Sequence, residues 1–262
     1  MSHWKSISTI ALAILLTYGL AWLGENPELL SPRGALIEND APPLPTLPPA
    51  TPTPSPTPSI PMYGEDELWM LAIASTRYPL SEQYEVETTT VEGYLFDERA
   101  AGALQDMLDA ARADGMDIRI TSAWRSRATQ AELYENRVYR FELEGYSREE
   151  AEEIGATVVA RPGTSEHELG LSVDLITDTY NVLDEGFAGQ PEYQWLLAHC
   201  AEYGFIQRYP PDKSDITGII WEPWHFRYVG GECAGYIMEH GLCLEEFLDL
   251  AGLLPESEEE TR

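Results

Sequence analysis

The sequence predicts a domain of the α+β class, and three observations support this. Along residues 63–255, segments with the apolar spacing of helices alternate with short segments typical of strands. These two kinds of segment do not follow the regular strand–helix–strand rhythm of a parallel sheet. The composition, with 44% apolar and 23% charged residues, is that of an ordinary globular protein with a real core.

The first predicted helix runs from Asp97, which we expect to cap it, to Asp114. Gly115 follows and is expected to end the helix. Apolar side chains recur at helical spacing on one face of this segment: Ala100, Leu104, Leu108 and Ala111. Residues 117–121 then alternate between polar and apolar types, which predicts a short strand directly after the helix.

The middle of the domain contains three further predicted helices and one strand. The first of these helices begins at Ala128, where apolar residues again fall at helical spacing. Ser147 and Glu150 form a capping box that predicts the start of the next helix. Residues 171–176 read as a strand, and residues 191–203 as a helix.

The last part of the domain is predicted to hold two short strands and two helices. The strands are residues 219–221 and 226–229, separated by Pro223, which interrupts regular backbone pairing. The helices are residues 231–240 and 244–253. Mixed elements of this kind complete the α+β pattern.

The charge of the chain restricts its partners. Forty-five Asp and Glu against 16 Lys and Arg give a formal net charge of −29. Such a surface repels phosphate backbones, so we expect no nucleic-acid partner, whereas metal ions and cationic groups suit it. Three cysteines are too few for a disulfide scaffold, although Cys233 and Cys243 could pair in an oxidising compartment.

The N-terminal segment, residues 1–24, has the features of a membrane anchor. From Ser6 to Gly24 there are 19 consecutive uncharged residues, most of them apolar, which is long enough to span a bilayer. A cleaved signal peptide is the alternative, but the end of the segment offers a poor cleavage site. Both interpretations place the rest of the chain outside the cytoplasm, with the cytoplasmic membrane as a partner if the segment is retained.

Residues 25–62 are expected to form an extended linker. Ten of the 19 prolines of the chain lie in residues 41–62, interleaved with Thr and Ser. Proline removes backbone donors and fixes φ, so this segment predicts an extended, polyproline-like spacer between the membrane and the domain. The acidic end, residues 256–262, is expected to be a disordered, solvated tail.

Two histidines with nearby carboxylates indicate chemistry. His167 precedes Asp174 by seven residues, and His225 follows Glu222 by three. Two histidines and one carboxylate can hold zinc with one position open, as hydrolytic sites require, and a second carboxylate can take the proton of the activated water. Spacing alone leaves a second interpretation open, because a histidine in a strand is often a structural residue.

Three ordered motifs make the pattern more specific. They are TSAWRS at residues 121–126, SEHELGLSVD at 165–174 and EPWHFRYVG at 222–230. These segments resemble the VanY-like D-alanyl-D-alanine carboxypeptidases, a group of zinc peptidases, over about residues 95–240. The resemblance implies a small antiparallel sheet flanked by helices, the hedgehog/DD-peptidase fold.

The resemblance also implies roles for individual residues. His167, Asp174 and His225 would be the ligands of one Zn²⁺ ion, and Glu222 would be the base that activates the water on it. Arg125 would bind the substrate and stabilise the transition state.

Two more positions match residues that hold the C-terminal end of the substrate in the family. They are Ser165 and Gln130. The chain departs from the family pattern at Trp124, where Tyr is usual, and at Ser172, where Ala is usual. Neither departure is a metal ligand, so we expect both to affect the shape of the substrate pocket more than the chemistry.

The expected function is therefore that of a zinc D,D-carboxypeptidase. It would remove the C-terminal D-Ala from peptidoglycan stem peptides. Its catalytic domain would lie outside the cytoplasm, anchored to the membrane by the N-terminal segment. Two alternatives share the same residues: an L,D-carboxypeptidase acting on stem tetrapeptides, and a non-catalytic cell-wall-binding module of the same fold. A dipeptidase for free D-Ala-D-Ala fits less well, since that substrate is cytoplasmic.

Overall fold

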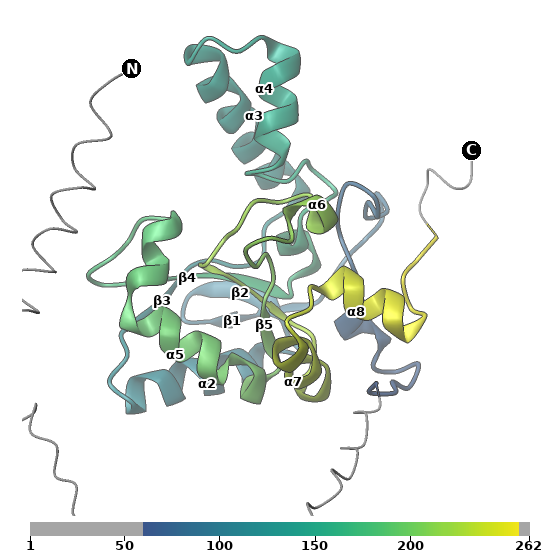
Figure 1. Ribbon diagram of the computed structural model, residues 1–262, viewed down its shortest axis with the longest axis vertical. Helices are drawn as coiled ribbons and strands as arrows, with labels where there is room; N and C mark the ends of the chain where they lie inside the picture. Colours follow the sequence, from purple (N-terminus) through teal and green to yellow (C-terminus); the bar gives the residue numbers. More distant parts are fainter. Residues whose placement is uncertain (1–59, 257–262) are drawn as a thin grey trace, which may run out of the picture. The chain divides into compact units, whose positions relative to one another are not determined.

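A four-stranded antiparallel sheet lies at the centre of the domain in the computed structural model (Figure 1). Its strands, in spatial order, are β3 (Ile118–Ser122), β4 (Ser172–Thr177), β6 (His225–Tyr228) and β5 (Phe205–Gln207). A separate hairpin pairs β1 (Thr88–Val91) with β2 (Tyr94–Asp97). The expected α+β class and small antiparallel sheet are confirmed.

The structure describes residues 60–256. The expected anchor at 1–24, nearly all of the linker at 25–62 and nearly all of the tail at 256–262 lie outside these residues. Within residues 60–256, no helix combines the length and the apolar character needed to cross a bilayer. All three cysteines of the chain lie in the described part, where each is buried and free, so Cys233 and Cys243 are not paired.

Seven α-helices surround the sheet within the described residues. They are α2 (Ala101–Ala113), α3 (Arg127–Leu143), α4 (Arg148–Ala156), α5 (Pro191–His199), α6 (Ser214–Thr217), α7 (Gly231–His240) and α8 (Leu244–Ala251). Short 3-10 turns complete the domain: η2 (Leu68–Leu71), η3 (Glu166–Leu169), η4 (Glu185–Gly189) and η5 (Cys200–Tyr203). Figure 1 shows α3 and α4 side by side at one end of the domain, away from α2, α5 and α7.

The two faces of the sheet have different chemistry because side chains alternate along a strand. Val173 and Leu175 of β4 and Phe226 of β6 are fully buried in the main core, together with Leu104 of α2 and Leu196 of α5. The intervening positions of the same strands carry polar and charged side chains: Ser172, Asp174, His225 and Arg227. The apolar face therefore anchors the sheet, and the other face is left for chemistry.

Helix starts that rest on local hydrogen bonds were predicted closely. Ser147 and Glu150 form the expected capping box at α4. The Ser126 side chain caps α3 by accepting a hydrogen bond from the backbone N–H of Thr129. The helix itself begins at Arg127, one residue before the expected start at Ala128. The helix expected at 191–203 continues as α5 and then tightens into η5 before Gly204 ends it.

Two predictions about elements are wrong. Asp97 does not cap α2: it is the last residue of β2, and its buried carboxylate accepts hydrogen bonds from the backbone and the guanidinium of Arg99. Residues 219–221 do not form a strand, because their backbone groups are not hydrogen-bonded to a neighbouring strand. The N–H of Ile220 donates to the carbonyl of Thr157 at 3.0 Å.

The sequence analysis did not anticipate the β1–β2 hairpin or β5. The hairpin turns at Glu92 and Gly93, both with positive φ (51° and 92°). The turn dipeptide is therefore Glu-Gly, whereas Asn-Gly or Asp-Gly is the sequence that usually marks such a turn. Strand β5 has only three residues, too few for a recognisable alternation.

Gly204 is required by both its backbone conformation and its surroundings. Its φ is +81°, and a Cβ would lie 2.7 Å from Cε2 of Tyr228. Gly115 has the same φ of +81° but nothing within 4 Å of its Cβ position, which makes it a matched control.

We expect Gly115→Ala to destabilise the domain by about 1 kcal/mol, the strain of a left-handed residue. Gly204→Ala should cost roughly 2 kcal/mol more because it also overpacks the contact with Tyr228. Urea unfolding of the two variants measures the difference. Equal losses would mean that the crowding at Gly204 is relieved without a free-energy penalty.

Candidate metal centre and active-site cleft

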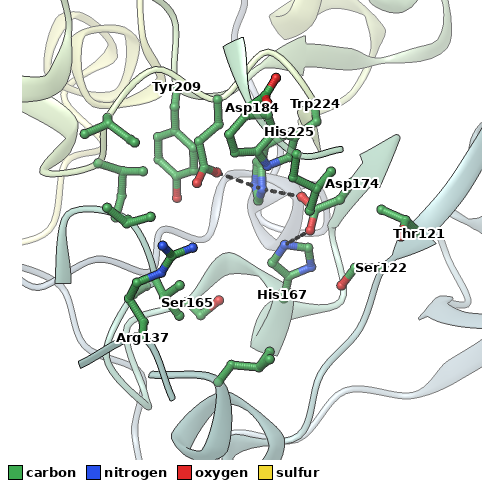
Figure 2. A pocket seen from close by; sticks show the side chains of 18 of the residues that line it. Thr121, Ser122, Arg137, Ser165, His167, Asp174, Asp184, Tyr209, Trp224 and His225 are labelled. Carbon is green, nitrogen blue, oxygen red and sulfur yellow. Dashed lines mark hydrogen bonds and ion pairs between the residues drawn. The ribbon is translucent and has the colours of Figure 1, made fainter. Parts of the chain in front are cut away.

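Three side chains with metal-ligating atoms converge on the polar face of the sheet. Asp174 of β4 and His225 of β6 are directly opposite each other in the antiparallel register. His167 comes from η3, which precedes β4 and turns into it through Gly170 at a φ of 77°. The ligating atoms of the three residues all lie within 4.8 Å of one another (Figure 2).

The distances within this group fit a small tetrahedral ion. Nε2 of His167 lies 3.2 Å from Oδ2 of Asp174, and Nδ1 of His225 lies 3.0 Å from Oδ1 of Asp174. Ligands of a tetrahedral zinc ion at about 2.0–2.1 Å from the metal are separated by roughly 3.3 Å. The group is already close to that spacing.

Hydrogen bonding orients His167 for ligation. Its Nδ1 lies 2.6 Å from the backbone carbonyl of Ala123. A carbonyl can only accept, so Nδ1 must carry the proton and Nε2 keeps a free lone pair directed at Asp174. The rings of His167 and His225 meet at 87° with centroids 4.9 Å apart, which places both imidazoles around one point.

The electrostatics of the group also favour a cation. Burial, supported by the charge of Arg125, lowers the pKa of His167 to about 4, so this imidazole is neutral at neutral pH, as a metal ligand must be. Burial alone would raise the pKa of Asp174, but its interactions with His167 and His225 outweigh this and hold it well below the ordinary value.

Glu222 is the second carboxylate of the site. It precedes β6, and its Oε2 lies 3.6 Å from Nδ1 of His225. Burial raises its pKa well above the usual value, and the negative charge of Asp174 adds to this effect. Two buried carboxylates beside two imidazoles are a set that a divalent cation would stabilise, so the residues present fit zinc.

Arg125 is held beside the ligands by three side chains. Its Nη2 donates to Oδ2 of Asp174 at 3.1 Å, its Nη1 to the amide oxygen of Gln130 at 2.9 Å and its Nε to Ser122 at 3.0 Å. The amide nitrogen of Gln130 donates in turn to the carbonyl of Ala160 at 2.7 Å. The structure thus connects Gln130 to Arg125 rather than leaving its amide group free.

All seven site residues predicted from the sequence line one cavity of about 1350 Å³. They are His167, Asp174, His225, Glu222, Arg125, Ser165 and Gln130. The cavity is bordered by α3, by the segment around residues 180–186 and by the loop at 219–222. Ser165 is 4% exposed and its side chain does not cap η3, so its hydroxyl is not committed to the helix.

The sequence analysis missed other residues of this cavity. Ser122 pairs with Asp174 in the β3–β4 register and supports Arg125. Tyr209 packs its ring against His225, with centroids 4.9 Å apart. Arg137 lies two helical turns after Gln130 on α3, and this seven-residue spacing was the signal that could have found it.

Comparison with known proteins gives a consistent result. The family model described as VanY, D-alanyl-D-alanine carboxypeptidase, matches residues 94–231. A D-alanyl-D-alanine carboxypeptidase from Enterococcus faecalis (strain ATCC 700802 / V583) is 42% identical over 187 residues, which are 71% of this chain and 68% of the relative.

Solved structures of similar proteins include two of VanY enzymes. VanYB in complex with D-alanine-D-alanine is 42% identical, with a TM-score of 0.64, and the match covers 69% of this chain and 98% of that one. A VanY D,D-pentapeptidase variant from a VanB-type resistance cassette, in complex with Zn(II), has a TM-score of 0.63 at 42% identity, covering 69% and 99%. The LD-carboxypeptidase LdcB is 33% identical, with a TM-score of 0.59, covering 69% and 86%.

Proposed function

The chain belongs to the VanY D-alanyl-D-alanine carboxypeptidase family, and from this we propose that it removes the terminal D-alanine from peptidoglycan stem pentapeptides. It is a zinc D-alanyl-D-alanine carboxypeptidase, with His167, Asp174 and His225 as its metal site. The observation that carries the proposal is that both catalytic candidates contact this ligand set: Glu222 lies 3.6 Å from His225, and Arg125 lies 3.1 Å from Asp174.

Zinc, when bound by these three side chains, acidifies a water molecule and polarises a carbonyl oxygen. Glu222 is the proposed base: it takes the proton from the attacking water and passes it to the amine of the leaving residue. Its burial suits both steps, because a carboxyl with a raised proton affinity can accept a proton and keep it until the amine departs.

Arg125 is the proposed stabiliser of the negative charge that develops on the carbonyl oxygen. Its guanidinium is held by Ser122, Gln130 and Asp174, so it needs little reorganisation during the reaction. Ser165 and Gln130 remain proposed contacts for the C-terminal end of the substrate. Because the amide of Gln130 is engaged by Arg125, it has a second role in positioning that arginine.

We expect Arg125→Lys to lower kcat by about 10²- to 10³-fold, as loss of one oxyanion donor does. Lysine keeps the charge but cannot reproduce three directed hydrogen bonds from one planar group. The comparison is made at saturating peptide, and zinc content is measured on the same sample. A kcat within threefold of the wild type would remove Arg125 from its proposed role.

An L,D-carboxypeptidase is the second candidate, because the similar enzyme LdcB is named an LD-carboxypeptidase. The two activities differ in the configuration of the residue before the scissile bond. A stem pentapeptide ends in D-Ala-D-Ala, whereas a tetrapeptide presents an L-residue before its terminal D-Ala. The metal site serves both, so the substrate must be tested.

The deciding experiment follows mass loss from synthetic pentapeptide and tetrapeptide with the zinc-loaded full chain. We expect release of one D-Ala from the pentapeptide, its loss on chelation and its return when zinc is added. Release from the tetrapeptide alone would make the protein an L,D-enzyme. A folded, zinc-loaded protein that releases nothing from either peptide would contradict an enzymatic function and favour the wall-binding alternative.

We further propose that the enzyme is anchored in the cytoplasmic membrane with its domain outside the cytoplasm. The support is the apolar segment Ser6–Gly24, followed by a proline-rich spacer. Protease added to intact cells after removal of the wall should cleave the protein. Full protection of the protein, with an external marker digested in the same sample, would contradict this location.

A further inference from the structure

Arg125 and the metal ligand His167 lie on two segments that are hydrogen-bonded directly to each other. The backbone N–H of Arg125 donates to the carbonyl of His167 at 3.1 Å, and Nδ1 of His167 donates to the carbonyl of Ala123 at 2.6 Å. Residues 123–127 are therefore paired with the loop at 163–168. A shift of one segment against the other would change the distance between the guanidinium and the metal ligands.

Just beyond this pairing, two side chains join the same segments again. Nε of Arg127 donates to Oε2 of Glu168 at 3.1 Å, and Oε1 of Glu168 accepts from the backbone N–H of Gly163 at 2.7 Å. Nη2 of Arg127 donates to the backbone carbonyls of Leu80 and Ser81, each at 3.1 Å. We call this set of hydrogen bonds the Arg127–Glu168 clasp.

The clasp differs from an ordinary surface ion pair, which contributes little because water competes for both partners. The Glu168 side chain is 5% exposed, and each of its two carboxylate oxygens has a donor. The backbone N–H of Leu80 also donates to the carbonyl of Gly163 at 2.7 Å, which closes the arrangement. Leu80 precedes residues 94–231, so the clasp includes chain outside the segment that matches the family model.

Gly163 is shaped to admit the guanidinium of the clasp. Its φ is +83°, and a Cβ at this position would lie 3.0 Å from Nη2 of Arg127. A side chain at residue 163 would therefore push the guanidinium away from Glu168 without removing any charge. This gives a second, independent way to open the clasp.

Neither side chain of the clasp is placed to touch the substrate in the cleft. Arg127 and Glu168 are not among the residues that line the cavity of about 1350 Å³ with the metal ligands. Both border a separate cavity of about 280 Å³, which Arg125 lines as well. Any effect of the clasp on the reaction must therefore pass through the segments that it joins.

We propose that the Arg127–Glu168 clasp positions Arg125 against the metal site by holding the two segments in register. In the proposed function, on which this inference rests, Arg125 stabilises developing charge, and such a group must be in place before the reaction. The clasp also keeps the carbonyl of Ala123 on Nδ1 of His167, and a partner of this kind orients a metal-ligating histidine. Arg127 and Glu168 are thus positioning residues.

Zinc affinity tests the clasp without any peptide. Arg127→Ala and Glu168→Gln should each raise the dissociation constant of zinc by about tenfold, measured on the full chain by competition with a chromophoric chelator. The double variant should be no weaker than the more affected single variant, because both substitutions open the same clasp. Arg127→Lys should recover part of the loss, since it restores the charge without the planar fork.

A second way of opening the clasp keeps the test valid if Arg127→Ala does not fold. Gly163→Ala should weaken zinc binding by about the same factor as Arg127→Ala. Gly115→Ala is its control, because Gly115 has a φ of +81° but nothing within 4 Å of its Cβ position. It should leave the zinc dissociation constant within about twofold of the wild type.

Arg148→Ala is the matched control for the loss of the arginine. Arg148 also pairs with carboxylates from two helices, Glu135 of α3 and Glu152 of α4, but it has no contact with residues 163–168. Zinc affinity should change by less than about twofold in this variant. A tenfold loss there would show that any broken ion pair weakens the site, and would overturn the proposal.

The catalytic arm asks whether the clasp acts through Arg125. At saturating zinc, Arg127→Ala should lower kcat for D-Ala release by about 10- to 100-fold, the usual effect of a small misplacement. In the Arg125→Lys background the same substitution should lower kcat by less than about threefold, because the group that it positions is already lost. A purely structural role would give the same factor in both backgrounds.

Two results would overturn the proposal: a zinc affinity unchanged in both Arg127→Ala and Gly163→Ala, or losses of kcat that are additive with Arg125→Lys. Because zinc binding is measured without a peptide, the clasp can fail this test while the D,D-carboxypeptidase activity stands. Weaker zinc binding in the clasp variants alone supports the proposal even if the pentapeptide is not hydrolysed.

Discussion

Glu222→Gln is expected to lower kcat for D-alanine release by about 10³-fold, with zinc content and folding unchanged. The substitution replaces one carboxylate oxygen by an amide nitrogen of similar size, so the cavity keeps its shape. It removes the group proposed both to accept the proton of the water and to return it to the amine, and general acid–base catalysis is worth about 10²- to 10⁴-fold. The measurement is single-turnover release of D-Ala from the pentapeptide at saturating enzyme.

Glu185→Gln is the control for this experiment. Glu185 also lines the cavity, but it is exposed and does not contact the ligand set. It should retain activity within about twofold, which separates the loss of a particular base from a general change in cleft charge. If Glu222→Gln retained more than a tenth of the wild-type kcat, another group would have to move the proton.

A buried ionic network lies next to the metal site in the structure, because one of its members, Glu166, directly precedes the ligand His167. Arg208 donates through Nε to Glu166 at 2.8 Å and through both terminal nitrogens to Glu245 at 2.8 and 2.6 Å. Nη1 of Arg227 lies 2.8 Å from Glu166, and both arginine side chains are completely buried. Glu166 precedes the ligand His167, so the network ties η3 to α8 and to the sheet.

Glu245→Gln is expected to reduce the free energy of unfolding by about 3–5 kcal/mol. Removing one partner of a buried ion pair leaves the other charge uncompensated, which costs more than the pair contributes. With two arginines and two glutamates the cluster is neutral, and the substitution would leave one buried positive charge in excess. Urea unfolding monitored by tryptophan fluorescence measures the change.

Glu246→Gln provides the neighbouring control. Glu246 pairs with Lys213 at 2.8 Å and caps α8, but both partners are partly exposed. Glutamine still fills the N3 position of a capping box, so the loss should stay below about 1 kcal/mol. If the two variants lost equal stability, burial would not be what makes the Arg208 network strong.

The helices of this domain could be predicted because their determinants lie close together in the sequence. The capping box at Ser147 and Glu150 is complete within four residues, and α7 begins and ends where the apolar spacing predicts. Asp97 shows the limit of this reasoning. Aspartate is common at helix starts, but the backbone of Asp97 belongs to strand β2, and its carboxylate accepts a hydrogen bond from the guanidinium of Arg99.

Strands depended on partners that the local sequence does not specify. Residues 219–221 have strand-like composition, yet no strand lies beside them to accept their hydrogen bonds. Strand β5 consists of three residues and exists because β6 pairs with it. The prediction of a strand is therefore incomplete until its neighbour is known.

The sequence by itself determined which residues are available for chemistry: two histidines, their acidic partners and Arg125, in ordered motifs. Only the tertiary structure decided how they meet. The β4–β6 register brings Asp174 opposite His225 across 51 residues of chain, and it is α3 that carries Arg137 to the cleft. The physical reason is range: caps and helical spacing act within about one turn, whereas strand pairing and shared burial join residues far apart in the sequence.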